Sequence, residues 1–552
     1  MTKVVQSEEA ISSIVQSGMS VHFSFTHNRS HVLAFELARQ FKDTRSLRLY
    51  GSGLLEYAAV LYGAGALSQV DCAFAGSAYP LPGPSASLQQ CVAEENADPH
   101  WSNLTMTLRL MAGAMGIPAI PTGSLFGSDL MKGEGRARVD SPFGELTLIE
   151  AIRPNVTFLH APIADTDGNV VIFGPYGEDL WGAWAADHVI VSAESIVSPE
   201  ELRSHAPHYG FPGARVDAVV LAPYGAHPQG QYVWDPSFDV ATYREDYKFR
   251  REFREVSADP SKLRRWIEEW VFDSTHDEFL ERLGSERLAR LAVQTAAVVS
   301  ESTSEQEDGE SAPATVDERA AVVAARTIGA HQGSFDSIIC GIGLSHLAAW
   351  LARRMSDPST VTPALVAETG LYGFTPSTDD PYLFSYDNSS ASLVHSDYVR
   401  MLGVLAGPAA RRCLTVVAAG QVDKTGAINS SLDAKGNFLV GSGGANDLCS
   451  GASDLLVVTK MGPQRMVEAV SFVSGNSKEM LGVATDVGLL ERSSDGELVL
   501  TSVMAPPGGE DEVVAYARTR CGWELKVSPT LTRLDPPSPT ELEILRSYAN
   551  VG

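Results

Sequence analysis

The feature that most constrains the fold of this 552-residue chain is an internal repeat. Residues 30–39 read SHVLAFELAR and residues 345–353 read SHLAAWLAR, so with a one-residue gap both follow the pattern S-H-L-A-x-x-L-A-R. A serine at a helix cap and leucines on one helical face explain this spacing. Each segment lies between two short apolar runs that are typical of buried strands. These runs are 20–25 and 47–50 around the first segment, and 337–341 and 364–367 around the second.

A second match supports the repeat. Residues 164–170, ADTDGNV, are echoed by residues 421–428, QVDKTGAI, and Asp and Gly at such spacing are typical of turns. Two matches in the same order indicate a duplicated domain. Strands that alternate with helices indicate sheets that are mainly parallel and covered by helices. We therefore predict an α/β fold of two related domains, each with a mainly parallel sheet flanked by helices.

A segment of biased composition separates the two copies. Residues 300–315, SESTSEQEDGESAPAT, are acidic, rich in Ser and Glu, and contain no aliphatic residue other than alanine. Such a composition cannot pack into a core, so we predict a flexible linker. The predicted domains are therefore residues 1–299 and residues 316–552.

The bulk composition argues against several classes of protein. A formal net charge of -26 at pH 7 argues against nucleic acid or an anionic membrane as the main partner. No stretch reaches about 18 uninterrupted apolar residues, so no membrane span is predicted. The N-terminal stretch MTKVVQSEEAISSIVQSG lacks the apolar core of a signal peptide. We therefore expect a cytoplasmic protein.

The cysteines and histidines do not indicate a metal site. The six cysteines are far apart and form no CxxC pair, which fits buried thiols in a reducing compartment. His27 and His31 are four residues apart and could share a helical face, but no third ligand lies near them in the sequence. We therefore predict no metal.

Two stretches of the second half carry candidate chemistry, because active sites of parallel sheets lie at the carboxyl ends of strands. Glu368 follows the apolar run 364–367, where a carboxylate caps the next helix, pairs with a base, or acts in catalysis. The glycine-rich stretch 441–447, GSGGAND, follows residues 437–440, which we also expect to form a strand. It exposes backbone N–H groups that can hold a phosphate or an oxyanion. On its own it is more often a tight turn, and it lacks the P-loop and dinucleotide patterns.

Longer matches in both halves go beyond these motifs. The second half carries ETG at 368–370, QVD at 421–423, INS at 428–430 and GSGGAN at 441–446. The first half carries VDAVVLAPYGAHP at 216–228, EWVFD at 269–273 and HDE at 276–278. In these stretches the sequence resembles class I CoA-transferases. More narrowly, it resembles the glutaconate CoA-transferase family with its α-type and β-type subunits fused in one chain, and the resemblance covers nearly the whole chain.

The resemblance implies a reaction. Glu368 would be the nucleophile that attacks an acyl-CoA, giving an acyl-glutamyl anhydride and then a glutamyl-CoA thioester. A carboxylic acid acceptor would then take the CoA by the reverse steps, in a ping-pong sequence. Coenzyme A would thus arrive as the acyl-CoA substrate, and no tightly bound cofactor is expected. The N–H groups of Gly443 and Gly444 would donate to the tetrahedral oxyanion, with Asn429 as a second donor.

The resemblance also implies where the substrate lies. The site would be between the two halves, with Ser77 on the substrate side of the first half, and a homodimer of fused chains is plausible. From their positions, His27 and Arg29 could read a second carboxylate or a polar acyl chain. One departure concerns residues 22–26, HFSFT, where the α-type half of the family carries a Gly-Gly-Phe turn.

Other reactions occur on the same fold. Its decarboxylase branch lacks the glutamate, so Glu368 argues against that branch. Its hydrolase branch depends on an acid in the α-type half, for which Glu94 and Glu95 are candidates. The alternative prediction is therefore an acyl-CoA hydrolase, acting on a thioester or opening a ring at a C–C bond. A CoA-ester-binding or scaffold protein without activity is a third hypothesis.

Overall fold

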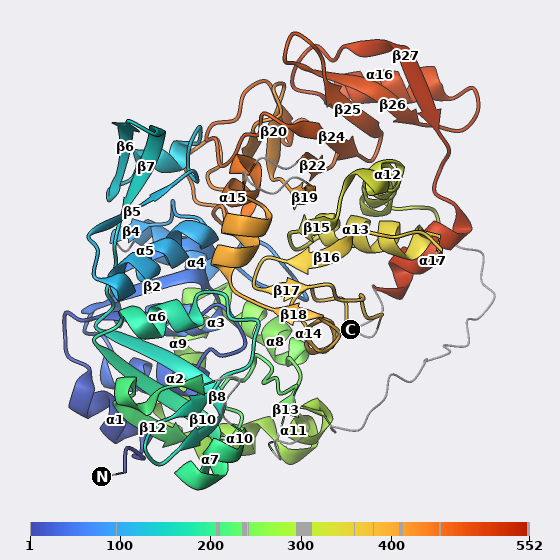
Figure 1. Cartoon of the computed structure of the whole chain (residues 1–552). Coiled ribbons are helices and arrows are strands. Elements are labelled where there is room, and N and C mark those ends of the chain that lie inside the picture. The colour runs from blue at the N-terminus through green and yellow to red at the C-terminus, as the bar shows by residue number, and fades with distance from the viewer. Residues whose placement is uncertain are drawn as a thin grey trace.

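The structure of the chain is a computed structural model, which Figure 1 shows as a cartoon. It describes residues 2–94, 96–205, 210–234, 240, 242–293, 312–357, 359–378, 380–407, 412–451 and 454–548. The predicted linker falls outside these ranges over residues 300–311, so its flexibility and the domain boundaries at 299 and 316 stay predictions. In Figure 1 the blue-to-green elements lie along the left and the bottom, and the yellow-to-red elements lie at the upper right.

The first half is built on a nine-stranded sheet. Strand β1 (Ser20–Phe23) pairs in parallel with β2 (Leu47–Leu54) on one side and β8 (Val156–Asp165) on the other. β8 pairs in parallel with β10 (His188–Val197), which pairs in parallel with β12 (Ala218–Leu221). The sheet also contains β3 (Leu67–Ala75), β4 (Asn96–Asp98), β9 (Val170–Val171) and β11 (Gly210–Phe211).

The second half is built on a ten-stranded sheet. Strand β15 (Ser337–Cys340) pairs in parallel with β16 (Ala364–Ala367) and with β19 (Cys413–Ala418). β19 pairs in parallel with β22 (Leu455–Val458), which pairs in parallel with β24 (Met480–Thr485). The sheet also contains β17 (Leu371–Tyr372), β18 (Val394–His395), β25 (Gly488–Arg492), β26 (Leu498–Met504) and β27 (Val527–Leu534).

The central parallel strands of the two sheets follow the same order. This order is β2-β1-β8-β10-β12 in the first half and β16-β15-β19-β22-β24 in the second. The repeated turns also correspond in detail. Asp165 Oδ1 and Asp423 Oδ1 each accept the backbone N–H groups two and four residues later. The predicted fold of two related, mainly parallel α/β units is confirmed.

Helices flank both sheets (Figure 1). Those of the first half are α1 (Ser7–Ile14), α2 (His31–Gln40), α3 (Glu56–Gly63), α4 (Ala86–Glu94), α5 (Asn103–Met115), α6 (Asp179–Ala185), α7 (Pro199–His205), α8 (Tyr247–Ser257), α9 (Pro260–Ile267), α10 (His276–Leu283) and α11 (Ser285–Leu291). Those of the second half are α12 (Val316–His331), α13 (Leu344–Met355), α14 (Tyr386–Ser390), α15 (Ala445–Ser450), α16 (Glu510–Arg520) and α17 (Pro539–Ser547).

The predicted serine cap holds in one copy of the repeat only. Ser30 caps α2, where its Oγ accepts the Leu33 N–H at 3.3 Å. In the second copy Gly343 is the cap residue of α13, so Ser345 lies inside the helix. The Ser345 hydroxyl instead donates to the carbonyl of Gly341 at 2.7 Å. The prediction is therefore wrong for the second copy, whose helix begins one residue before the serine.

Three smaller sheets complete the described structure. They are β5-β7-β6, with β5 (Ala119–Thr122), β6 (Arg136–Ser141) and β7 (Gly144–Glu150); β13-β14, with β13 (Thr242–Tyr243) and β14 (Ala292–Val293); and β21-β20-β23, with β20 (Gln421–Asp423), β21 (Ile428–Asn429) and β23 (Met466–Val467).

Residues 437–440, which were expected to form a strand before the glycine-rich stretch, do not belong to the second sheet. Phe438 forms an isolated bridge with Leu432, and the Val440 carbonyl accepts the Ala75 N–H of the first half at 2.9 Å. This segment therefore leads the glycine-rich stretch away from its own sheet and onto the end of β3.

Candidate active site

Three segments that are far apart in the sequence meet around the half-buried side chain of Glu368. Glu368 directly follows β16, at the carboxyl end of that parallel strand. The second segment is the start of α5, and the third is the glycine loop, residues 441–444, which leads into α15. Figure 1 shows α15 where the two halves meet. Both halves therefore contribute to the surroundings of this carboxylate.

The first half contacts Glu368 through Asn103, the first residue of α5. Asn103 Nδ2 donates to Glu368 Oε1 at 3.1 Å. Ser102 caps the helix, because its Oγ accepts the Thr105 N–H at 3.2 Å. The positive end of the α5 dipole therefore lies next to Glu368, which favours the ionised carboxylate.

The glycine loop contacts the other oxygen of the same carboxylate. A Cβ placed on Gly444 would lie 1.8 Å from Glu368 Oε2, so only glycine fits here without displacing the carboxylate. Gly443, at a φ of +52°, donates its N–H to the Ala73 carbonyl at 2.9 Å and accepts the Asn103 N–H at 3.0 Å. The loop is therefore fixed to β3 and α5 of the first half.

Two of the predicted oxyanion donors are already engaged. The Gly443 N–H is bonded to β3, as described above. Asn429 Nδ2 donates to the Leu432 carbonyl at 2.6 Å and to Gln421 Oε1 at 2.9 Å, within the second half. In the part of the chain that the structure describes, the Gly444 N–H has no hydrogen-bond partner. The geometry therefore favours Gly444, and not Gly443 or Asn429, as a donor to a bound group.

Burial, and after it the negative charge of Asp447, raise the pKa of Glu368 to about 8. The hydrogen bond from Asn103 acts in the opposite sense and is outweighed. No Lys, Arg or His side chain among the described residues forms an ion pair with Glu368. Burial also raises the pKa of Asp447, to about 6. The site is therefore a pair of carboxyl groups without a cation beside them.

Asp447 connects α15 to the first half. It is buried, and its Oδ1 accepts the Ser102 hydroxyl at 2.6 Å and also the Ser124 hydroxyl. Its Oδ2 accepts the Leu104 N–H at 3.1 Å. The residues on both sides of Asn103 are thus held by one carboxylate from the other half.

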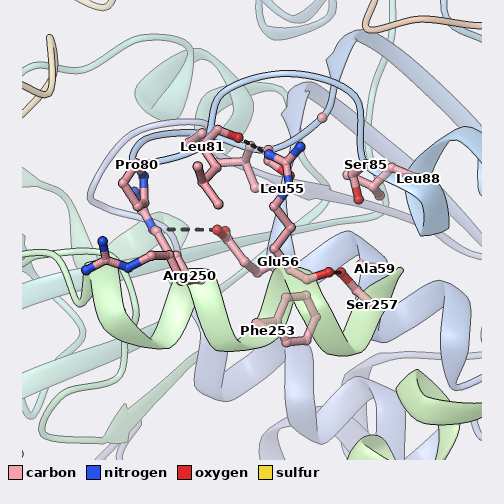
Figure 2. A pocket seen from close by; sticks show the side chains of 15 residues that line it. Leu55, Glu56, Ala59, Pro80, Leu81, Ser85, Leu88, Arg250, Phe253 and Ser257 are labelled. Carbon is pink, nitrogen blue, oxygen red and sulfur yellow. Dashed lines mark hydrogen bonds and ion pairs between the residues drawn. The ribbon is translucent and has the colours of Figure 1, made fainter. Parts of the chain in front are cut away.

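Ser77 lies in a different part of the first half. It lines a pocket bounded by α3, by α8 and by the loop that follows β3, and Glu368 is not among the lining residues. Its backbone N–H donates to the Gly83 carbonyl at 2.8 Å. Figure 2 shows this pocket, with Glu56 and Arg250 directed toward each other and 3.5 Å between Glu56 Oε1 and Arg250 Nε.

Arg29 and His27 are buried in the first half and are engaged by protein groups. Arg29 donates to the Phe25 carbonyl at 3.1 Å and to Gln229 Oε1 at 3.0 Å. His27 stacks on Tyr232 with 4.4 Å between ring centroids, and burial holds the pKa of His27 well below its usual value. These contacts favour a structural role for Arg29 over recognition of a substrate carboxylate.

The acids expected for a hydrolase lie elsewhere. Glu94 is exposed near the end of α4, where its carboxylate accepts the Tyr62 hydroxyl and the Gln90 amide, each at 2.6 Å. Glu95 lies outside the described residues. The first half instead brings Glu178 to this junction: it is buried and accepts the Ser52 hydroxyl at 2.5 Å. The preceding residue, Gly177, donates its N–H to the Thr369 carbonyl at 2.9 Å.

Sequence reasoning missed Asn103, Asp447 and Glu178. The spacing of Ser102 and Thr105 marks the start of a helix, but no local pattern tells that this start faces Glu368. Asp447 is the last residue of the GSGGAND stretch, and no role was predicted for it. Glu178 carries no signal of its own, because its importance depends only on which residues lie near it.

The described ranges contain neither a cluster of metal ligands nor a membrane-spanning helix. No group of three or more His, Cys, Asp or Glu side chains within them is placed to hold a metal ion. No helix within them is long and apolar enough to cross a membrane. All six cysteines are free thiols, of which five are buried and Cys521 is half-buried.

Comparison with known proteins agrees with this architecture. Residues 4–222 match the coenzyme A transferase family. The chain is 35% identical over 202 residues to the A-type subunit of glutaconate CoA-transferase from Acidaminococcus fermentans. This match covers 33% of this chain and 61% of that protein. It is 29% and 26% identical to the A-type and B-type subunits of 3-oxoadipate CoA-transferase from Pseudomonas knackmussii. These two matches cover 49% and 40% of this chain, and 94% and 90% of the two relatives.

The fold is also that of a solved enzyme structure. The acyl-CoA transferase of Escherichia coli O157:H7 superposes with a TM-score of 0.68 at 14% identity, over 97% of this chain and 95% of that chain. Residues 4–222 are thus similar to the coenzyme A transferase family, and the matches of the chain to both an A-type and a B-type relative fit a fusion of the two. The chain spans 61% of the length of the glutaconate CoA-transferase relative that it matches.

Proposed function

We propose that the protein is a CoA-transferase that moves CoA from an acyl-CoA to a carboxylic acid, with Glu368 as the covalent nucleophile. The observation that carries this proposal is the position of the Glu368 carboxylate. It lies at a strand end between the two halves, where a Cβ on Gly444 would be, and it accepts the side-chain amide of Asn103. Among the described residues, the N–H of Gly444 has no hydrogen-bond partner. The match of residues 4–222 to the coenzyme A transferase family supports the same reaction class.

In the first step, a Glu368 carboxylate oxygen attacks the thioester carbonyl, and the carbon–sulfur bond breaks. This gives an acyl-glutamyl anhydride and a CoA thiolate. The thiolate then attacks the glutamyl carbonyl, which expels the first carboxylate and leaves a glutamyl-CoA thioester. A second carboxylate reverses these steps and leaves as a new acyl-CoA. A carboxylate suits this sequence because its acylated form stays reactive enough to pass the group on.

Each step passes through a tetrahedral oxyanion that needs hydrogen-bond donors. We propose that the Gly444 N–H and Asn103 Nδ2 supply them, in place of the predicted Gly443 and Asn429. Support comes from the contacts of each group, because Gly444 and Asn103 touch Glu368 whereas Gly443 and Asn429 are bonded elsewhere. Losing one such donor typically costs about 3 kcal/mol of barrier.

The nucleophile must be ionised to attack. Because the pKa of Glu368 is raised to about 8, a substantial fraction is protonated at neutral pH. Among the described residues no cation pairs with Glu368, which is consistent with this role, since an ion-paired carboxylate would be a weaker nucleophile. The raised pKa also places the group close to the working range expected for a catalytic carboxyl.

The test is to trap the intermediate. The protein is incubated with a panel of acyl-CoAs, treated with borohydride or hydroxylamine, and digested to find the modified peptide by mass spectrometry. We expect a modification at Glu368 and a turnover that depends on an added carboxylic acid. Glu94→Gln is the matched control, because Glu94 is an exposed acid of the first half; this variant should keep full transfer.

The same assay separates the alternatives. Release of CoA at full rate without an acceptor acid would favour an acyl-CoA hydrolase, and loss of that release in Glu94→Gln would point to the acid first expected for it. An absence of both adduct and turnover across the panel would favour a binding protein. A homodimer of fused chains stays a prediction, which light scattering of the purified protein checks.

A further inference from the structure

We propose that Asp447 is a positioning residue: it holds the start of α5 from the other half of the chain and so sets the contact between Asn103 and Glu368. This inference rests on the proposed function, in which Glu368 is the nucleophile. Asp447 itself forms no hydrogen bond with Glu368 and does not contact the reacting atoms.

The contacts of Asp447 converge on one turn of helix. Its carboxylate accepts the Ser102 hydroxyl at 2.6 Å and the Leu104 N–H at 3.1 Å. These two residues flank Asn103, whose side chain donates to Glu368 Oε1 at 3.1 Å. The Asp447 carboxylate therefore sets the position of the Asn103 amide, because it accepts hydrogen bonds from the side chain of Ser102 before it and from the backbone of Leu104 after it.

The same residue also fixes the glycine loop relative to α5. Asp447 lies in α15, three residues after Gly444, so its anchoring to the first half holds the start of that helix in place. The carbonyl of Gly443 in turn accepts the Asn103 N–H at 3.0 Å. Both groups proposed to face the oxyanion, on Asn103 and Gly444, thus depend on one buried side chain.

The charge of Asp447 adds an effect that a purely structural residue would not have. The titratable groups that face Glu368 are Asp447 from α15, Cys340 at the end of β15, and Tyr398 from the segment before residues 399–405. The negative charge of Asp447 raises the pKa of Glu368, whereas the amide of Asn103 lowers it. Removing Asp447 and removing Asn103 should therefore shift the titration of Glu368 in opposite directions.

The experiment compares Asp447→Asn with Asn103→Ala by steady-state transfer kinetics from pH 5.5 to 9.5. For Asp447→Asn we expect kcat to fall about 10- to 100-fold, because a displacement near 1 Å has effects of this size, with KM within about threefold. Its acidic limb of kcat/KM should move to lower pH. For Asn103→Ala we expect a comparable loss of kcat, with the acidic limb moved to higher pH.

Two further variants serve as controls. Asp433→Asn removes an exposed carboxylate of the same half, whose hydrogen bonds are confined to its own turn. It should leave kcat and the pH profile unchanged. Ser102→Ala combined with Ser124→Ala removes two hydroxyl donors to Asp447 while keeping its charge. This double variant should lower kcat without moving the acidic limb, and it replaces Asp447→Asn if that variant does not fold.

A kcat equal to that of the wild type in Asp447→Asn would overturn the proposal. If Asp447→Asn does not fold, a wild-type kcat in the double variant would do so. A shift of the Asp447→Asn limb toward higher pH would do the same. Failure of the proposed function is distinguishable, because it appears in the wild-type protein as the absence of an adduct at Glu368. In that event, carbodiimide modification of Glu368 is measured as a function of pH in wild type and in Asp447→Asn. We expect the modification profile of the variant to be shifted to lower pH, and identical profiles would refute the inference.

Discussion

Glu56 and Glu368 occupy matching places in the two halves and have opposite surroundings. Glu56 follows β2 and Glu368 follows β16, and each of these strands pairs in parallel with the central strand of its sheet. Glu56 Oε1 is 3.5 Å from Arg250 Nε. Burial lowers the pKa of Arg29, and the charge of Glu56 acts in the opposite sense. Glu368 faces Asp447, Asn103 and Gly444.

The difference teaches that a carboxylate at a strand end is defined by its partners. The side chain of Glu56 is only 11% exposed, yet the two arginines balance its charge. Glu368 is also half-buried, but it has a neighbour of the same sign, and burial and this neighbour raise the pKa of Glu368 to about 8. One acid is suited to hold the fold together, and the other is suited to react.

The largest effect that this comparison predicts is on catalysis. Glu368→Gln should reduce transfer by roughly 10⁴-fold or more, because an amide cannot attack the thioester. Glu56→Gln should keep kcat within a few-fold of wild type under conditions where it is folded. Transfer assays with both variants check this, and an active Glu368→Gln variant would remove the basis of the comparison.

The next effect concerns the contact that distinguishes Glu368. Gly444→Ala should lower kcat by about 10- to 100-fold, because the added methyl group would overlap Glu368 Oε2 and turn the carboxylate away. Gly462→Ala is a matched control, since Gly462, like Gly444, has no positive φ and has open space where a Cβ would be. Full activity in Gly444→Ala would mean that the carboxylate does not need its present orientation.

A third prediction concerns stability. Glu56→Gln leaves Arg250 and Arg29 buried beside an uncharged side chain, and breaking a buried pair costs about 3 kcal/mol. Urea unfolding at pH 7 measures the loss. Glu94→Gln serves as an exposed control and should change the free energy of unfolding by less than about 0.5 kcal/mol. A Glu56→Gln variant as stable as the wild type would show that the charge of Glu56 does not contribute to stability.

Glu368→Gln should have the reverse effect on stability at high pH. The pKa of Glu368 is higher in the folded protein, about 8, than its ordinary value of 4.5. Its favourable contribution is therefore complete below pH 4.5 and is lost as pH rises through 8. Gln stays neutral throughout, so the variant should gain roughly 4 kcal/mol relative to wild type between pH 5 and pH 9. Thermal unfolding across this range checks it; a difference independent of pH would contradict the raised pKa.

The smallest effect is the pH dependence of the wild-type enzyme. Because only the ionised form of Glu368 attacks, kcat/KM should rise with pH through a midpoint of about 8 and then level off. A midpoint near 4.5 would mean that the site does not perturb this carboxyl, and Glu368 would then resemble an ordinary exposed acid.

The sequence predicted the fold well where the signal was local. The apolar runs at 20–25 and 337–341 contain β1 and β15, and the Asp turns at 165 and 423 have the same hydrogen bonds. Residues 437–440 were interpreted wrongly as a strand of the second sheet, because the segment instead bonds to Ala75 of the other half. Local pattern does not reveal which surface a short extended segment will cover.

The candidate site was predictable only in part, for the same reason. Glu368 and the glycine loop were found because their own sequence is unusual, and their roles stay a proposal. Asn103 was missed because its meaning comes from a contact with a residue in the other half. Asn429 has the chemistry of a donor, but its amide is used by Leu432 and Gln421. Residue type predicts what a group can do, whereas long-range packing decides whether the group is free to do it.

The bond between Asp447 and the start of α5 also has a consequence for the assembly of the molecule. Burying Asp447, Ser102 and Ser124 at a junction removes water from polar groups, which weakens the association of two separate chains. In a single chain the two halves meet at an effective concentration in the millimolar range, so the junction needs little affinity of its own. The covalent connection thus allows the surface between the halves to be chosen for the accuracy of its hydrogen bonds rather than for its strength.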